Sequence, residues 1–145
     1  MLEKQVSEME RRYSIMKAAN CRDVERYNQL SDVEYLPWHL IVIDEYQDLT
    51  SDTEERKQLE PKLKRLAQKG RAAGIHIILA TQKPSSEVIN TTVRSCFPAQ
   101  LALAVKNSTD SRVIMDETGA ETLCGKGDAF FRAKNQLRRV QCARV

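Results

Sequence analysis

One six-residue run restricts the fold of this chain more than any other: residues 40–45 read Leu-Ile-Val-Ile-Asp-Glu. Four consecutive apolar residues, most of them β-branched, predict a strand buried on both faces, as in a parallel sheet. The strand ends abruptly in two acids, Asp44 and Glu45. Because ligands of open α/β sheets bind beyond the carboxyl ends of the strands, these two acids are candidate site residues.

The pair Asp44 and Glu45 suits nucleotide hydrolysis. An aspartate there can hold Mg²⁺, usually through water, and a glutamate can polarise an attacking water. Taken alone, the run also fits a strand that merely continues into an acidic loop. A second apolar run, residues 75–80, ends in Thr81 and Gln82. If the two strands are neighbours, Gln82 can sense the γ-phosphate or orient water; the alternative is an ordinary strand-end loop.

Apolar periodicity in the rest of the chain predicts an α/β fold. Leu2, Val6, Met9, Tyr13 and Met16 form one stripe of an amphipathic helix. A longer helix is expected from a capping box of Ser51 and Glu54 to about Gly74. Further strands are expected at residues 75–80, 101–105, 127–132 and 137–145. The order strand, helix, strand, helix, strand predicts a mostly parallel sheet flanked by helices.

Length and composition fit one domain with a hydrophobic core: 145 residues, 41% hydrophobic and 30% charged. No apolar run approaches the roughly 18 residues that span a bilayer, and residues 1–13 lack the apolar core of a signal peptide. We therefore expect no membrane contact from this segment and a cytoplasmic location, with a membrane anchor of the full-length protein, if there is one, in a region not present here. The four cysteines lack zinc-site spacing and favour reduced thiols. A net charge of +3 does not by itself indicate nucleic acid.

A phosphate-binding loop is missing from the sequence. Such a loop needs the pattern G-x-x-x-x-G-K-[ST]. The nearest match, residues 119–126, has five residues between its glycines, and Gly127 follows the lysine where Ser or Thr is required. Residues 125–128 are instead predicted to form a tight turn.

Several short motifs, in order, resemble the FtsK/SpoIIIE family of DNA translocases over nearly the whole chain. They are Glu-Met-Glu-Arg-Arg-Tyr at 8–13, Tyr-Asn at 27–28, Leu-Pro at 36–37, the run at 41–45, Arg-Leu-Ala-Gln-Lys-Gly-Arg-Ala-Ala-Gly-Ile-His at 65–76, Ala-Thr-Gln-Lys-Pro-Ser at 80–85, Asp-Ser-Arg at 110–112, Gly-Ala-Glu at 119–121 and Gly-Lys-Gly-Asp at 125–128. The resemblance implies a partial RecA-like P-loop NTPase core. Residues 1–145 would be the C-terminal part of the motor domain, with residues 1–35 as a helical lead-in and 36–145 carrying the Walker B strand and the strands after it.

For function, the resemblance implies an ATP-driven motor that forms a homo-hexamer around double-stranded DNA, with ATP and Mg²⁺ as cofactors. By position, Asp44 would hold Mg²⁺ indirectly, Glu45 would be the catalytic base and Gln82 the polar sensor. Arg71 and Arg112 match signature arginines, and whether they contact nucleotide or a neighbouring subunit stays open. The alternative for both arginines is a structural ion pair.

Two departures from the family pattern bear on activity. Because the phosphate-loop half is absent, the chain looks like a fragment or a degenerate product, and we expect it to be inactive alone. Typical members also carry Pro-x-Arg where this chain has Pro98, Ala99 and Gln100. That arginine is a candidate finger for the neighbouring subunit, and neutral Gln100 cannot stabilise the transferring phosphoryl group in the same way.

Two other functions fit the same motifs. One is an FtsK-like ATPase of a secretion or conjugation system, which moves protein or DNA–protein complexes. The other is a catalytically inactive remnant that docks onto a complete motor.

Overall fold

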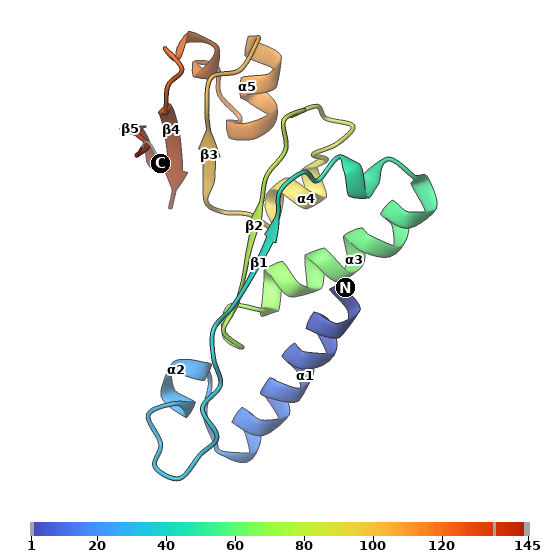
Figure 1. Ribbon diagram of the computed structural model, residues 1–145, viewed down its shortest axis with the longest axis vertical. Coiled ribbons are helices and arrows are strands. Elements are labelled where there is room, and N and C mark those ends of the chain that lie inside the picture. Colours follow the sequence, from blue (N-terminus) through green and yellow to red (C-terminus); the bar gives the residue numbers. More distant parts are fainter. Residues whose placement is uncertain (1, 135, 144–145) are drawn as a thin grey trace. The chain divides into compact units, whose positions relative to one another are not determined.

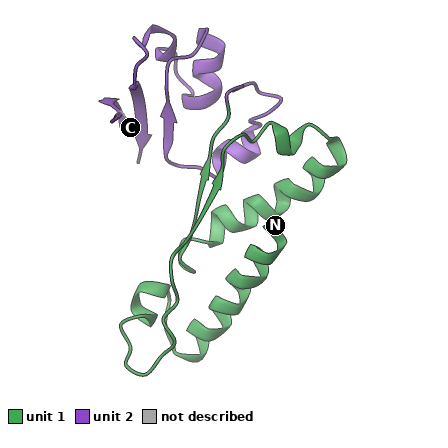
Figure 2. Cartoon of the chain, viewed as in Figure 1, with its two compact units in different colours: residues 1–81 green, residues 82–145 purple. Residues whose placement is uncertain are grey.

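The computed structural model describes residues 2–134 and 136–143, and the chain divides into two compact units, residues 1–81 and 82–145 (Figure 2). The first unit contains α1 (Leu2–Ala18), α2 (Val24–Tyr27), β1 (His39–Ile43), η1 (Asp48–Thr50), α3 (Thr53–Lys69) and β2 (Ile75–Leu79). The second contains α4 (Thr91–Ser95), β3 (Gln100–Ala102), α5 (Ser108–Met115), η2 (Ala120–Thr122), β4 (Asp128–Ala133) and β5 (Gln136–Gln141). The predicted α/β class is confirmed.

In the first unit, β1 and β2 form a parallel pair, and α1 and α3 lie side by side next to it (Figure 1). The two helices run in the same direction along each other. Lys62 of α3 pairs with Glu3 of α1 at 2.6 Å, and the Tyr13 hydroxyl donates to the Lys69 carbonyl at 2.7 Å. Alternate strand residues, Ile41 and Ile43 among them, are buried.

The other face of this strand pair is exposed, so the prediction of a strand buried on both faces is wrong for β1. Leu40 is 61% exposed, Val42 57% and Ile78 52%. Successive side chains of a strand point to opposite faces, so the residues between the buried ones form a second apolar face. Helices cover only one face of the pair among the described residues of this unit, and the second face is therefore left open.

The strand predicted at residues 101–105 does not extend the parallel pair. The observed strand β3 pairs antiparallel with β4, with Leu101 opposite Phe131, and β4 pairs antiparallel with β5. Two residues separate β4 from β5 in the sequence, which suits antiparallel neighbours because parallel strands need a long crossover. Only β1 and β2 are therefore parallel among the described strands.

The boundaries of α3 also differ from the prediction. Its N-cap is Asp52, whose carboxylate accepts from the Glu54 and Glu55 amides at 2.8 and 2.9 Å. Ser51 instead donates to the Asp48 carbonyl. The helix ends at Lys69, before Gly74, which adopts a left-handed φ of +72° and leads directly into β2.

The second unit has its own small core under the β3-β4-β5 sheet. Buried Ala102, Met115, Ala120 and Leu123 pack together with partly buried Phe130. No helix in the described residues is long and apolar enough to cross a bilayer.

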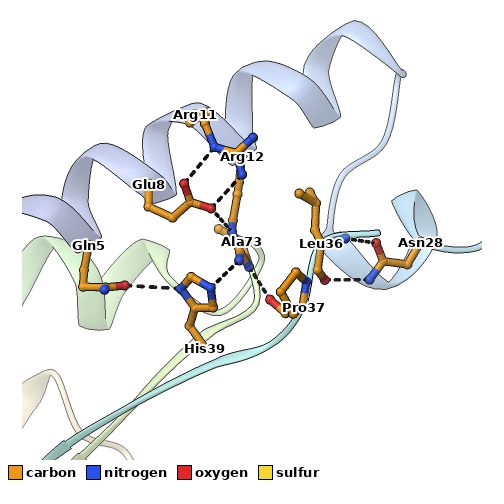
Figure 3. Close-up of polar contacts among 9 residues, drawn as sticks. All are labelled: Gln5, Glu8, Arg11, Arg12, Asn28, Leu36, Pro37, His39 and Ala73. Atoms are coloured by element: carbon orange, nitrogen blue, oxygen red, sulfur yellow. Dashed lines mark hydrogen bonds and ion pairs between the residues drawn. The ribbon is translucent and has the colours of Figure 1, made fainter. Parts of the chain in front are cut away.

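A buried arginine joins α1 to the start of both parallel strands (Figure 3). Arg12 is 1% exposed. Its Nη1 donates to the Pro37 carbonyl at 2.7 Å and to the Ala73 carbonyl at 2.9 Å. His39 pairs with Ile75 in the sheet, and Pro37 and Ala73 each precede one of these two residues by two positions. The Pro37 and Ala73 carbonyls are therefore in register with each other. Arg12 therefore fixes the relative positions of the two chain segments that enter the sheet.

The remaining nitrogens of Arg12 are also bonded. Nε donates to Glu8 Oε1 at 2.8 Å, and Nη2 lies 2.8 Å from His39 Nε2. Because a guanidinium can only donate, His39 Nε2 must accept, and the ring proton then sits on Nδ1, 3.3 Å from the Gln5 Oε1 acceptor. A buried charge is tolerated when its hydrogen bonds are satisfied in this way.

We expect Arg12→Met to destabilise the chain by about 3 kcal/mol, because it leaves two backbone carbonyls without their donor in the core. Urea denaturation of the purified variant measures the change. Arg11→Met is the matched control. Arg11 directly precedes Arg12 and also bonds Glu8, but its side chain is 48% exposed. Its removal should cost clearly less, because it leaves no buried backbone carbonyl without a donor and Glu8 keeps its hydrogen bond from Arg12. Equal losses in both variants would contradict a special role for Arg12.

Glu8 should make stability fall in acid. The hydrogen bond from Arg11, with a further one from Arg12, lowers the pKa of Glu8 from 4.5 to about 2. A carboxyl whose pKa is lower in the folded chain contributes stability above pH 4.5 and loses it as the pH falls from 4.5 to 2. Glu8→Gln should therefore flatten the dependence of the unfolding free energy on pH within that window. An unchanged slope in the variant would show that the pair with arginine does not stabilise the fold.

Candidate functional site

The two strands predicted to carry site residues are parallel neighbours, as predicted. Ile43 pairs with Leu79, and the pairing continues beyond the strand ends: the Ala80 amide donates to the Ile43 carbonyl at 2.8 Å, and the Tyr46 amide donates to the Ala80 carbonyl at 2.9 Å. The segments 44–45 and 80–81 therefore leave the sheet at the same edge.

Glu45 is held at this edge by Thr81, which lies just after β2. Its Oε1 accepts from the Thr81 hydroxyl at 2.5 Å and from the Gln47 amide at 3.2 Å. Glu45 is partly buried, whereas Asp44 is exposed. Hydrogen bonds to a charged carboxylate are among the stronger ones, so the Glu45 side chain has a defined orientation.

The turn after Glu45 is anchored by Tyr46. This side chain is fully buried, and its burial raises the pKa of the phenol to about 12. The Tyr46 carbonyl accepts from the Thr50 hydroxyl at 3.1 Å, which ties the turn to η1. The two acids therefore stand on a fixed backbone between the end of β1 and a buried aromatic ring.

The other predicted site residues lie away from this pair or in the second unit. Arg71 is exposed in the turn before β2, at the opposite end of the strands from Asp44. Five strand residues separate the two ends by about 16 Å, so the structure does not bring Arg71 to the acids of its own chain. Gln82 is exposed and directly follows Thr81. It begins the second unit, and its role as a sensor remains a prediction.

Arg112 and Gln100 belong to the second unit. Arg112 is exposed on α5, and its carbonyl accepts from Arg94 Nη1 at 3.2 Å. Gln100 begins β3, and its Oε1 is buried without a hydrogen-bond partner in the described part of the chain. Arg94, not singled out from the sequence, pairs with Asp116 at 2.8 Å and stabilises the end of α5.

Thr81 is the site residue that sequence reasoning passed over in favour of Gln82. Its hydroxyl donates to Glu45 Oε1 at 2.5 Å. The signal was present: two parallel strands of equal length place residues just after their ends beside each other. The hydroxyl next to a candidate base could have been identified on that ground.

The donor set at this edge fits Mg²⁺ that arrives with a nucleotide. Mg²⁺ prefers oxygen ligands and is commonly bound by one or two carboxylates, substrate phosphates and water. The carboxylate of Asp44 could supply a water-mediated contact of this kind. No cluster of three or more His, Cys, Asp or Glu side chains suited to a metal occurs in residues 2–134 and 136–143.

Residues 125–128 form the predicted tight turn. The Asp128 amide donates to the Gly125 carbonyl at 3.0 Å, and Lys126 and Gly127 both have positive φ. The Asp128 carboxylate accepts from the Cys124 amide and pairs with Arg139, which lowers the pKa of Asp128. The Asp128 carboxylate therefore already accepts a backbone hydrogen bond at this turn, which supports the view that the turn is not a phosphate loop.

Comparisons with known proteins agree with the motifs. Residues 29–86 match the model of the FtsK/SpoIIIE family. DNA translocase FtsK of Treponema pallidum is 40% identical over 134 residues, which is 89% of this chain and 16% of the relative. DNA translocase SftA of Bacillus subtilis is 42% identical over 130 residues, 87% of this chain and 13% of the relative. The chain thus spans less than a fifth of the length of these curated relatives.

Solved structures of ATPase motor domains share the fold. The pCW3 conjugation coupling protein TcpA, in its monomer form with ATPγS, is 25% identical, with a TM-score of 0.87 over 97% of this chain and 42% of that one. The cytoplasmic domain of the type VII secretion ATPase EccC of Thermomonospora curvata is 21% identical, with a TM-score of 0.83 over 99% of this chain and 17% of that one. The latter likeness concerns the fold alone.

Proposed function

Since this chain belongs to the FtsK/SpoIIIE family, we propose that it is the Walker B half of an ATP-driven double-stranded DNA translocase motor. The observation that carries the proposal is the sheet edge at which Asp44 and Glu45 follow β1 and Thr81 follows its parallel neighbour β2. Acids at this edge are where an α/β sheet offers groups to a ligand.

Each acid has a separate task in the proposed reaction. Asp44, which is exposed, would be the residue that holds Mg²⁺, and Glu45 takes a proton from the water that attacks the γ-phosphorus. When bound, Mg²⁺ neutralises charge on the phosphates. Gln82 follows Thr81 and is positioned by sequence to act as the polar sensor.

The phosphate cradle must come from a segment outside the 145 residues. The open face of the β1–β2 pair, formed by Leu40, Val42 and Ile78, supports this arrangement. A contiguous exposed apolar face usually marks an interaction surface. We use the term complete motor for this segment when it is joined to a phosphate-loop segment of the same family. It works in the cytoplasm as a homo-hexamer around double-stranded DNA.

The signature arginines are assigned to contacts between subunits. Arg71 lies at the end of the strands remote from Asp44, so a neighbouring subunit's nucleotide suits it better than its own. Arg112 is exposed on α5 and is a second candidate. Gln100 cannot replace an arginine finger because it carries no positive charge.

A second candidate function is transport in conjugation or secretion. The likeness to the conjugation coupling protein TcpA, at 25% identity and a TM-score of 0.87, favours this alternative over an inactive remnant. Stimulation of the ATPase by duplex DNA separates a motor that moves DNA, in conjugation or otherwise, from one that moves protein and from an inactive remnant. A DNA translocase responds to any duplex, a protein-moving ATPase does not, and an inactive remnant has no activity to stimulate.

In the complete motor, we expect Glu45→Gln to lower turnover by about 10²–10⁴-fold, because loss of a general base typically has this effect. ATP affinity should persist because the phosphate contacts lie elsewhere. Phosphate release and equilibrium binding of a non-hydrolysable ATP analogue measure the two quantities separately. Near-normal turnover in the variant would exclude Glu45 as the base.

We expect this chain alone neither to hydrolyse ATP nor to bind it tightly. The backbone amides and lysine of a phosphate loop, which supply most of the affinity for the triphosphate, are absent from the sequence. Calorimetry with ATP and Mg²⁺, together with a phosphate-release assay with duplex DNA, tests the expectation. Micromolar binding by this chain would contradict the absence of a phosphate site.

A further inference from the structure

The contact between Thr81 and Glu45 joins two backbones that are already fixed. Ala80, the residue before Thr81, donates its amide to the Ile43 carbonyl at the end of β1, and its carbonyl accepts from the Tyr46 amide. Glu45 stands between Ile43 and Tyr46, the two residues of that segment that make those bonds. The 2.5 Å hydrogen bond between the side chains therefore joins neighbouring strand ends whose backbones are already hydrogen-bonded to each other.

The chemistry of the two groups defines the direction of this bond. A carboxylate can only accept, so the Thr81 hydroxyl donates to Glu45 Oε1. Threonine is branched at Cβ and has few rotamers, which favours a donor in one position. Glutamate is flexible, so a donor of this kind selects one of its orientations.

We propose that Thr81 is a positioning residue that holds the Glu45 carboxylate in the orientation from which it takes the proton of the attacking water. The inference rests on the proposed function of Glu45 as the base. Thr81 itself transfers no proton and touches no substrate in this proposal. Its contribution is to keep a flexible acid in one place before the reaction begins, since small misplacements of a catalytic group can cost up to about 100-fold in rate.

Substitutions at Thr81 separate the hydroxyl from the shape of the side chain. Thr81→Val keeps the branched shape and removes the donor, whereas Thr81→Ser keeps the donor. In the complete motor, we expect Thr81→Val to lower kcat by about 10- to 100-fold and to leave the affinity for a non-hydrolysable ATP analogue within about twofold. Thr81→Ser should restore most of the rate. A normal kcat in Thr81→Val, or an equal loss in Thr81→Ser, would overturn the inference.

The double variant tests whether Thr81 acts through Glu45. If it does, Thr81→Val adds little to the defect of Glu45→Gln, because the two changes remove one shared effect. Additive defects would show an independent role for Thr81. The outcomes also distinguish this inference from the proposed function. A silent Glu45→Gln overturns both, whereas an inactive Glu45→Gln with a normal Thr81→Val overturns only the role of Thr81.

A second measurement needs no nucleotide and uses this chain as it is. The carboxyl ¹³C shift of Glu45, assigned with the Glu45→Gln variant, should move in Thr81→Val and stay near its original value in Thr81→Ser. An unmoved signal in Thr81→Val would show that the hydroxyl does not bond the carboxylate in solution. If valine disturbs the fold, as seen by circular dichroism, Thr81→Ala replaces it in both measurements.

Discussion

The buried guanidinium of Arg12 is the constraint on which the first unit depends. It binds the Pro37 and Ala73 carbonyls, which precede the two parallel strands at equivalent positions, and it also bonds Glu8 and His39. An arginine that is 1% exposed is tolerated only because its donors are used in this way. The same bonds hold β1 and β2 in register and attach α1 to them.

Register at one end of a short parallel pair determines geometry at the other. Because β1 and β2 pair over five residues without a bulge, the segments after Ile43 and Leu79 leave the sheet together. Glu45 therefore meets Thr81, about 16 Å from Arg12's end of the strands. The register that Arg12 fixes at one end of the strands therefore also determines which residues lie beside each other at the other end.

Local patterns predicted much of this arrangement from the sequence. Apolar spacing located α1, and two apolar runs that end in polar residues gave the parallel pair and its site edge. Features that depend on tertiary packing were not predicted. Arg11 and Arg12 are adjacent and look alike in sequence, yet only Arg12 is buried. The open face of Leu40 and Val42 was not predicted either, because four consecutive apolar residues do not show which face of a strand is covered.

The central claim is that the edge formed by Asp44, Glu45 and Thr81 is the hydrolytic site of a family motor. A structure of the complete motor with Mg²⁺ and a non-hydrolysable ATP analogue tests it most directly. We predict that the γ-phosphate lies at this edge, with Glu45 within hydrogen-bond reach of a water in line with the phosphorus and Asp44 contacting the metal through water. A nucleotide bound elsewhere, with Glu45 remote from the γ-phosphate, would contradict the claim.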